Sequence, residues 1–508
     1  MTAKVKTFAF LGIKAINVDV QVKISSGKPI FSIVGLGDKA VAESKERVRA
    51  AISSMGLEFP HNRVTVNLAP ADLAKEGSHY DLAIAVGLLI ELGVIKQSDI
   101  DQYYFLGELS LDGFLAQVNG ILPASIEANA KDCGIVCPEI CGIEAIWSGN
   151  KNIIAAPNLI SLINHFKNRQ FIAKPQNLQQ EEKINYSDLK DIKGQEIAKR
   201  ALEIAAAGGH NLLMIGPPGT GKSMLASRMA GILPDLNVKE MLEINMINSI
   251  GGKLDGKNLV RKRPFRDPHH SCSVPAMVGG GTKAKPGEIS LAHNGVLFLD
   301  ELAEFPRTVL ESLRQPIENG HVTISRVNSH INYPASFQLI AAMNPCRCGY
   351  LGDDSRSCNR APKCGRDYQA KISGPLLDRM DIIVDVNQID VFAINSLKEG
   401  EPSKTVALRV ERARQIQEDR YQSEMEMQNI SSKTNSKAST NIIEKYVKLD
   451  QESQEILKKA IDKMQSSMRS YNRILRVART IADLEESQNV NKFHILEALK
   501  YKKALGVI

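Results

Sequence analysis

The segment that most constrains this chain is GPPGTGKS at residues 216–223. It fits the pattern GxxxxGK[ST], and it follows the apolar run LLMI and precedes a helical pattern, as this phosphate-binding motif requires. Glycines let backbone N–H groups surround phosphate oxygens, and the N-terminus of the following helix adds partial positive charge. The sequence therefore predicts a buried strand at 211–215, a phosphate-binding loop and a helix at 223–230, which indicates a parallel α/β core.

The same loop predicts which residues contact a nucleotide. Lys222 is expected to reach the β- and γ-phosphates, and the Ser223 hydroxyl is expected to hold Mg²⁺. The expected contacts to ATP run through the loop and into its helix: Gly216, Pro217, Pro218, Gly219, Thr220, Gly221, Lys222, Ser223 and Met224. A Gly/Pro turn that binds nothing is disfavoured by the strand before the loop and the helix after it.

Two later segments supply polar groups that complete such a site. Residues 295–301, GVLFLDE, read as a buried strand that ends in two acids. Asp300 is expected to coordinate Mg²⁺ through water, and Glu301 to orient and deprotonate the attacking water. Alone, such a strand end is mostly structural, but the upstream loop reverses that reading. Asn344 follows another apolar run and is expected to bind the same water or the γ-phosphate, although an Asn there is otherwise a common turn former.

Length and composition limit the remaining possibilities. At about 150 residues per domain, 508 residues suggest roughly three domains. The net charge of +7 permits a nucleic-acid partner without requiring one. The most apolar stretch, residues 81–95, contains Glu91 and is shorter than the about 20 residues that span a bilayer. The N-terminus lacks the features of a signal peptide, so we expect a cytoplasmic protein without a membrane partner.

Shifts in composition predict the domain boundaries. Residues 1–172 alternate as mixed α and β, with strands in NVDVQVKI and RVTVNLAP and a helix near 81–92. Residues 173–187 are polar and predict a linker. Residues 188–387 form the α/β core, and residues 388–508 are charged and helical. Within that last part, residues 430–440 are rich in Ser, Lys and Asn and are expected to be a mobile connection.

Three segments carry a resemblance to a known family. GPPGTGKS, VLFLDE and AAMNP occur in the order of an AAA+ nucleotide site, and RDPHHSCSVPAMVGGGTKAKPGEISLAHNGVLFLDE and SGPLLDRMDI closely resemble the magnesium-chelatase-like ComM/YifB family. The resemblance implies a P-loop AAA+ ATPase core with a C-terminal helical lid, assembled as a homo-hexameric ring. It also implies that Arg379 acts as an arginine finger in a neighbouring subunit's site.

The resemblance extends to both ends of the chain. In the helix SMRSYNRILRVARTIADL, Arg469, Arg473 and Arg476 are candidate nucleotide sensors; Arg469 and Arg476 share a helix face, and we do not choose between them. Residues 64–89 and 105–123 resemble an S5-type α+β domain of Lon proteases, whose serine needs a neutral lysine. Here Ser78 is one residue out of register, and Leu122 stands where the lysine would fall. Proteolysis is therefore not expected, unless Lys75 or His79 supplies the base.

Four cysteines lie close together in the polar loop 346–364. Cys346, Cys348, Cys358 and Cys364 could surround one tetrahedral zinc ion, and a loop without its own core gains order from such a site. Their spacing is irregular, so structural Zn²⁺ and free thiols both remain open. The three cysteines between 133 and 141 are expected to be ordinary thiols. The adjacent His269 and His270 are expected to have a structural or pore-loop role rather than to bind metal.

Basic segments suggest contacts with DNA. Residues 261–266, RKRPFR, contain Arg261 and Arg263, and residues 319–334 predict a hairpin that carries Arg326 and His330. Backbone phosphate contacts from a cationic hairpin would give affinity without sequence preference. A solvated charged loop is the alternative for each residue.

These patterns lead to one main hypothesis of function and one alternative. We expect an ATP-driven ring that moves single-stranded and branched duplex DNA, with helicase or branch-migration activity in recombination of the natural-transformation type, as the family resemblance implies. The alternative is a protein-remodelling or metal-chelatase-like motor without DNA activity. An ATP-dependent protease is opposed by Leu122.

Overall fold

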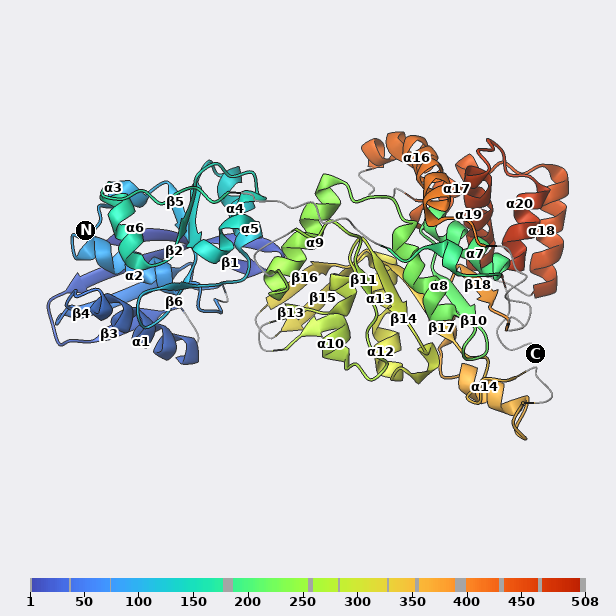
Figure 1. Cartoon of the computed structure of the whole chain (residues 1–508), viewed down its shortest axis with the longest axis horizontal. Helices are drawn as coiled ribbons and strands as arrows, with labels where there is room; N and C mark the ends of the chain where they lie inside the picture. The colour runs from blue at the N-terminus through green and yellow to red at the C-terminus, as the bar shows by residue number, and fades with distance from the viewer. Residues whose placement is uncertain are drawn as a thin grey trace.

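The computed structural model describes residues 2–35, 38–73, 75–176, 186–254, 259–281, 284–326, 329–351, 356–388, 399–428, 434–464 and 468–502. Two mixed α/β parts follow each other along its long axis, and a group of helices covers the end of the second part (Figure 1). The strands of the first sheet come from residues 3–156, and those of the second come from residues 212–385, so each part contains a sheet of its own.

The N-terminal part is built on a seven-stranded sheet in the order β3-β4-β2-β1-β5-β8-β9. The alternating strands NVDVQVKI and RVTVNLA lie in β2 and β4, as the sequence predicts, because every second side chain enters the core. Its strands are β1 (Ala3–Leu11), β2 (Lys14–Ser25), β3 (Phe31–Val34), β4 (Arg63–Ala69), β5 (Tyr103–Phe105), β8 (Gly134–Pro138) and β9 (Ile153–Ala156). The apolar stretch from residue 81 is helix α2 (Asp81–Glu91), which is buried along most of its length.

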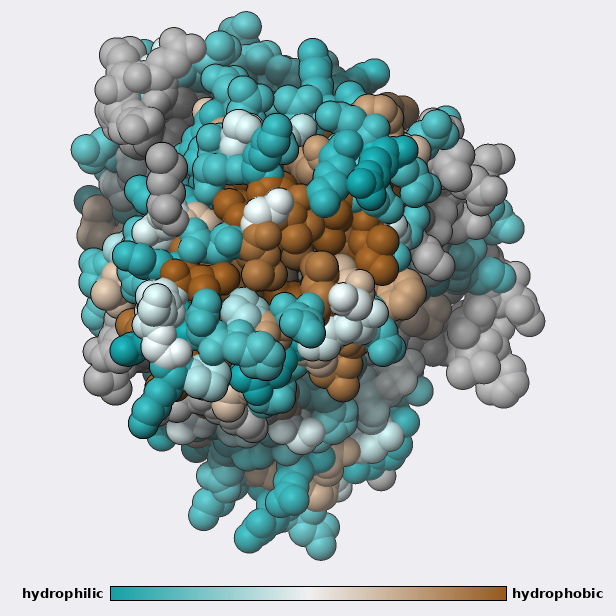
Figure 2. Space-filling model, turned by 90° about the vertical axis from the view of Figure 1, so that its left-hand side faces the viewer, coloured by the Kyte–Doolittle hydropathy of each residue, from teal (hydrophilic) through white to brown (hydrophobic). Residues whose placement is uncertain are grey.

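Helices and a small hairpin complete this N-terminal part. The helices are α1 (Asp38–Ser54), α3 (Gln97–Ile100), α4 (Ile121–Ala130), α5 (Gly142–Ile146) and α6 (Leu159–Phe166), and the hairpin pairs β6 (Glu108–Leu109) with β7 (Leu115–Ala116). At the end that points away from the rest of the chain, apolar side chains gather around a hollow (Figure 2). Partly buried apolar residues that pack on this core include Met55, Leu57, Phe59 and Val94. The core of this part is therefore incompletely covered.

The central part contains the parallel α/β core that the phosphate-loop motif predicts. Its five strands run in the order β11-β14-β17-β10-β18, and each strand pairs in parallel with its neighbours. They are β10 (Leu212–Ile215), β11 (Phe265–Arg266), β14 (Val296–Leu299), β17 (Gln338–Met343) and β18 (Ile382–Asp385). β10, β14 and β17 are buried along their whole length, which explains their unbroken apolar runs.

Short helices and two hairpins surround this sheet. The helices are α7 (Glu196–Gly208), α8 (Lys222–Arg228), α9 (Val238–Gly251), α10 (Val274–Val278), α11 (Glu288–Leu291), α12 (Arg307–Ser312), α13 (Arg314–Asn319), α14 (Lys363–Gln369) and α15 (Gly374–Leu377). One hairpin pairs β12 (Gly279–Gly280) with β13 (Lys285–Pro286), and the other pairs β15 (His321–Arg326) with β16 (Ser329–Pro334). The second hairpin agrees with the sequence prediction for residues 319–334.

The C-terminal part is helical. It comprises α16 (Ser403–Gln428), α17 (Thr440–Tyr446), α18 (Gln451–Met464), α19 (Met468–Leu484) and α20 (Lys492–Lys500). Helices α16 and α19 pack on α7 and share the apolar core of the parallel sheet (Figure 1). No helix among the described residues is both long and apolar enough to cross a bilayer.

One sequence expectation for this part is wrong. Residues 430–440 were expected to form a mobile connection, but Asn435 is fully buried within the described part of that segment. Its side chain accepts from the Tyr421 hydroxyl at 2.6 Å and donates to Asp483 at 2.8 Å, while its backbone N–H donates to Gln417. Polar composition misled the prediction, because these polar groups bond to one another inside the protein rather than to water. Residues 429–433 of that segment lie outside the described residues.

A buried carboxylate joins the N-terminal part to the nucleotide-binding part. Glu144 accepts from the Leu122 N–H at 2.9 Å, at the start of α4, and from the Ser249 hydroxyl at 2.5 Å, on α9. Gln117 adds a bond to the Leu254 carbonyl at 3.3 Å. Burial raises the pKa of Glu144. Because a buried acceptor of this kind is costly to leave unpaired, the contact fixes how the two parts meet.

Candidate nucleotide site

Three neighbouring strands bring the predicted nucleotide residues to one edge of the sheet. β10 pairs in parallel with β17, and β17 pairs in parallel with β14, so their carboxyl ends point the same way. Gly216, Asp300 and Asn344 follow directly after these strands. In open α/β sheets, ligands bind outside the carboxyl ends of the strands. The sequence prediction that these segments converge therefore agrees with the strand register.

The loop after β10 has the backbone freedom that a phosphate cradle needs. Gly219 and Gly221 adopt φ angles of +76° and +87°, which are strained for other residues. A Cβ at Gly216 would lie 2.1 Å from the Val386 carbonyl oxygen. Thr220 donates to the Pro217 carbonyl at 3.0 Å, and half of the Met224 side chain is exposed beyond the loop.

The Lys222 side chain folds back onto the loop that precedes it. Its Nζ donates to the carbonyls of Gly216 at 2.8 Å and Pro217 at 2.7 Å, and to Asn344 Oδ1 at 3.3 Å. Burial lowers the pKa of Lys222, while the charges of Asp300 and Glu301 oppose that shift. The ammonium group thus lies between the loop and the polar end of β17, where a phosphate would replace its carbonyl contacts.

Ser223 and Asp300 form an oxygen pair at the start of α8. Ser223 Oγ donates to Asp300 Oδ2 at 2.6 Å, and the other carboxylate oxygen accepts from the Glu301 N–H at 2.8 Å. A hydroxyl and a carboxylate are hard oxygen ligands of the kind that Mg²⁺ prefers. The residues present therefore fit a magnesium ion shared with a nucleotide.

Glu301 faces a histidine that sequence reasoning did not connect with the site. Glu301 has a left-handed backbone, at φ +50°, and its side chain is half exposed. His270 Nδ1 lies 3.4 Å from Glu301 Oε2, and the His270 ring contacts the His269 ring in a tilted arrangement, with 4.1 Å between centroids and 33° between planes. Their position in the sequence could have indicated this contact, because the two histidines follow β11, and β11 pairs in parallel with β14, the strand that leads to Glu301. A structural role for them was expected, but contact with this acid was not.

Arg379 lies at the opposite edge of the sheet from the phosphate loop. It precedes β18, which runs parallel to β10 with Leu212 opposite Ile382, and its carbonyl accepts from Asn211 Nδ2 at 2.9 Å. Asn211 comes just before β10, whereas the phosphate loop comes just after it. Four residues at about 3.3 Å each separate these two edges by about 13 Å. Arg379 therefore cannot belong to the same nucleotide site as Lys222 of its own chain.

The arginines of α19 lie at that same edge. Arg473 donates to the Met380 carbonyl at 3.2 Å and is buried. Arg476 is packed beside Asp381 and Arg473, and burial lowers its pKa. Arg469, in the first turn of the helix, is 55% exposed. Of the two candidate sensors that share a helix face, Arg469 is therefore the accessible one.

The cysteine loop brings thiols together. The sulfur atoms of Cys346, Cys348 and Cys364 all lie within 4.8 Å of one another, and those of Cys346 and Cys348 are 3.0 Å apart. Hydrogen bonds from Cys346 and from backbone N–H groups lower the pKa of Cys348 to about 6. Cys358, the fourth predicted ligand, is not part of this group of three, although it hydrogen-bonds Cys348 and Cys364. Soft sulfur ligands in this arrangement fit zinc better than they fit magnesium.

The basic residues expected to bind DNA separate into two groups. Arg326 and His330 lie on the strands of the β15–β16 hairpin, where His330 is exposed and its Nδ1 lies 3.1 Å from the Ser325 hydroxyl. Arg261 is exposed before β11. The structure does not favour Arg263, because its guanidinium donates to the carbonyls of Pro234 and Asn294 and to Glu240. The run RKRPFR does not distinguish such an internal arginine from an exposed one.

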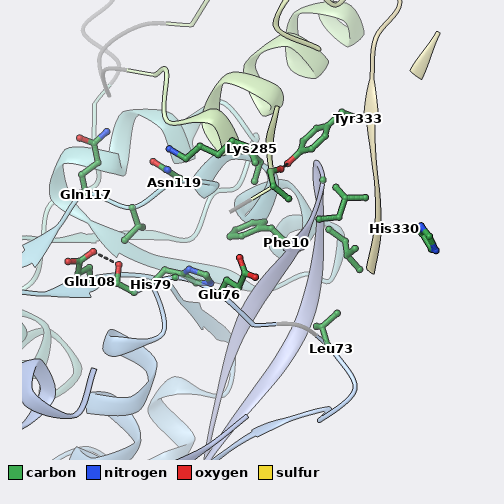
Figure 3. Close-up of a pocket in the computed structure, with 18 of the residues that line it drawn as sticks. Phe10, Leu73, Glu76, His79, Glu108, Gln117, Asn119, Lys285, His330 and Tyr333 are labelled. Atoms are coloured by element: carbon green, nitrogen blue, oxygen red, sulfur yellow. Dashed lines mark hydrogen bonds between the residues drawn. The ribbon is translucent and has the colours of Figure 1, made fainter. Parts of the chain in front are cut away.

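A cavity of about 480 Å³ lies between the N-terminal part and the two hairpins of the central part, as Figure 3 shows. Ser78 is one of the residues that line it. Ser78 Oγ donates to the Glu108 carboxylate, and not to Lys75 or His79. Lys75 donates to the carbonyls of Pro70 and Leu73, and burial lowers the pKa of His79 to about 4 while its Nε2 contacts the Phe8 carbonyl. Neither candidate base is bonded to Ser78, which weighs further against serine proteolysis.

Comparisons with known proteins identify the family. A family model described as magnesium chelatase, subunit ChlI, matches residues 188–394. A second model, described as subunit ChlI of Mg-chelatase, matches residues 20–140, and a third, described as the C-terminal part of magnesium chelatase subunit ChlI, matches residues 400–502. Competence protein ComM of Haemophilus influenzae is 42% identical over 98% of this chain and 97% of its own length. The chain belongs to the ComM/YifB family of magnesium-chelatase-like AAA+ proteins.

Other similarities extend this result. Uncharacterized protein YifB of Escherichia coli is 41% identical over 98% of this chain and 96% of its own length. Lon protease 2 of Bacillus subtilis is 26% identical over 32% of this chain and 33% of its own length, so that similarity is partial. Membership of an AAA+ family implies ATPase activity with ATP and Mg²⁺, and the nucleotide edge described above has the matching chemistry.

Proposed function

We propose that this member of the ComM/YifB family is an ATP-driven ring, a homo-hexamer, that moves branched and single-stranded DNA. One observation carries the proposal: the phosphate loop and Arg379 lie at opposite edges of one sheet. A complete nucleotide site then needs two subunits, each of which supplies one edge. Head-to-tail contacts of this kind close into rings when the rotation between subunits allows it.

The chemistry follows from the groups at the two edges. Lys222 and the loop N–H groups would hold the β- and γ-phosphates, with Asn344 beside them. Ser223 and Asp300 would hold Mg²⁺, which supplies neutralising charge at the phosphate oxygens. Glu301 would orient the attacking water and accept its proton, and Arg379 of the next subunit would balance charge as the γ-phosphoryl group leaves. Arg469 and Arg476 are the proposed sensors.

The domain arrangement belongs to the same proposal. Residues 1–172 would be a Lon-protease-like domain without the catalytic dyad, joined through residues 173–187 to a core of residues 188–387 and a helical lid of residues 388–508. Leu122, which is fully buried and offers no base, supports an assembly or guidance role for the first domain. Residues 177–185 of the proposed linker lie outside the described residues.

The DNA part of the proposal has two supports. The β15–β16 hairpin carries Arg326 and His330, and a relative that matches along the whole chain is named a competence protein. A metal-chelatase-like or protein-remodelling motor is the alternative, favoured by the descriptions of the matching family models. The test is ATP turnover of the purified protein with and without single- and double-stranded DNA, followed by three-strand branch migration. Absence of DNA binding at low salt would favour the remodelling motor.

Replacing Arg326 with alanine is expected to weaken DNA binding and to flatten its salt dependence. Removing one phosphate contact should reduce the slope of log K against log salt by about one, because fewer counterions are released. Fluorescence anisotropy at several salt concentrations measures this slope. Arg412→Ala, which removes an exposed charge on α16, is the matched control and should leave the slope unchanged. A slope of wild-type size in the Arg326 variant would remove that residue from the DNA path.

We also propose that Cys346, Cys348, Cys358 and Cys364 bind one structural Zn²⁺. Metal analysis of the purified protein is expected to find about one zinc per chain, bound by four thiolates and therefore without an open catalytic position. Cys364→Ser should lower the zinc content and the thermal stability of the protein, whereas Cys272→Ser should change neither. Wild-type protein that contains no zinc after purification in its presence would show that these are free thiols.

A further inference from the structure

Two arginines of the proposed subunit boundary converge on one carboxylate. Glu318, on α13, places Oε1 2.6 Å from Arg379 Nη2 and 2.9 Å from Arg469 Nη2. The three residues come from α13, from the turn after α15 and from the first turn of α19. A single oxygen atom therefore connects the core, the proposed arginine finger and the beginning of the proposed lid helix.

The two arginines are held to different degrees. Arg379 is 11% exposed, and its Nε and Nη1 also donate to the carbonyls of Arg314 and Pro375 at 3.2 and 2.6 Å. A guanidinium has five N–H groups. The two contacts with carbonyl groups and the one with Glu318 use three of those on Arg379, which leaves two for a further acceptor. Arg469 is 55% exposed, and Glu318 is 43% exposed. Arg469 and Glu318 are therefore accessible at the surface, whereas Arg379 is mostly covered.

We propose that Glu318 is a positioning residue for the site between subunits. It holds Arg379 and Arg469 side by side, so that both guanidinium groups meet the phosphates bound to the neighbour. Two adjacent cations repel each other, and a shared anion offsets that repulsion before the ring forms. Groups that are already in place stabilise developing charge without reorganising during the reaction. This inference rests on the proposed function.

If Glu318 mainly stabilised the fold, its loss would lower the free energy of unfolding; if it positions the two arginines, its loss would lower turnover instead. The pair between Arg469 and Glu318 joins two exposed side chains, and such pairs contribute little to folding, about 0–1 kcal/mol each. Arg379 is mostly covered, but without Glu318 it would keep the carbonyl groups of Arg314 and Pro375 as acceptors. Loss of Glu318 should therefore leave the fold and the chain's own phosphate loop intact, since that loop lies at the other edge of the sheet. A large effect on turnover would have to arise at the boundary between subunits.

The first measurement is ATP turnover of Glu318→Ala and Glu318→Gln. We expect at least a 10-fold fall in kcat for Glu318→Ala, a smaller fall for Glu318→Gln, and little change in KM for ATP. The control is Glu311→Ala, which removes the 2.6 Å pair with Arg314 nearby and should behave as wild type. Unchanged turnover of Glu318→Ala would overturn the proposal, and so would a rise, because a rise would mean that Glu318 competes with phosphate for the arginines.

Mixing experiments then assign the defect to one edge. Glu318→Ala subunits mixed with Lys222→Ala subunits should regain activity, because about a quarter of the boundaries combine an intact loop with an intact arginine pair. Mixed with Arg379→Ala subunits they should not, since both variants are damaged at the same edge. The mixture of Lys222→Ala with Arg379→Ala tests the proposed function itself. If that mixture stays inactive, the shared site is wrong; if it recovers and Glu318→Ala does not complement Lys222→Ala, only the role of Glu318 is wrong.

Discussion

Replacing Glu301 with glutamine is expected to lower the rate of ATP hydrolysis by a factor of about 10² to 10⁴, which is what a positioned general base contributes. Glutamine has nearly the same size but accepts no proton from water. ATP binding should persist, because Lys222 and the loop N–H groups are unchanged, and so should assembly. Steady-state phosphate release and equilibrium binding of a fluorescent nucleotide measure the two effects separately.

The control for this change is Glu304→Gln, a nearby acid whose carboxylate lies 3.5 Å from Lys371. It should hydrolyse ATP at the wild-type rate. Wild-type turnover by Glu301→Gln would instead remove Glu301 as the base.

Replacing Arg379 with alanine is expected to reduce turnover by about 10³, the lower end of the effect of arginine fingers in GTPases. The variant should bind ATP with wild-type affinity, since its phosphate loop lies at the far edge of the sheet. Phosphate release at saturating ATP, together with nucleotide affinity, separates these outcomes. Arg307→Ala, an exposed arginine on α12, is the control and should retain full turnover. A variant of Arg379 with turnover within a factor of about two of wild type would exclude it from the reaction.

Local motifs allowed much of the nucleotide edge to be predicted from sequence. Residues 216–223 carry their own backbone requirements, so the strand, loop and helix around them follow from a few neighbouring residues. Asp300 and Asn344 could be expected nearby because the carboxyl ends of parallel strands share an edge. The hairpin at residues 319–334 was also predicted from the sequence, and it is formed by β15 and β16.

Contacts between distant segments could not be predicted in this way. Glu318 meets Arg379 and Arg469 across long stretches of chain, and no local pattern marks which of many glutamates accepts from them. Arg263 stands in a basic run that reads as a surface, yet it bonds to carbonyls of its own chain. In each case the partner is set by tertiary packing, which hydrophobic period and residue type do not encode.

The proposed site between subunits makes turnover depend on dilution, because the phosphate loop and Arg379 lie at opposite edges of one sheet. In the proposed assembly an isolated subunit has no complete site, and an open arc always has one fewer complete site than it has subunits. Closing the arc adds that last site without adding protein. Hydrolysis per subunit should consequently decline toward zero as the protein is diluted below the dissociation constant of its subunits, more steeply than bound nucleotide does.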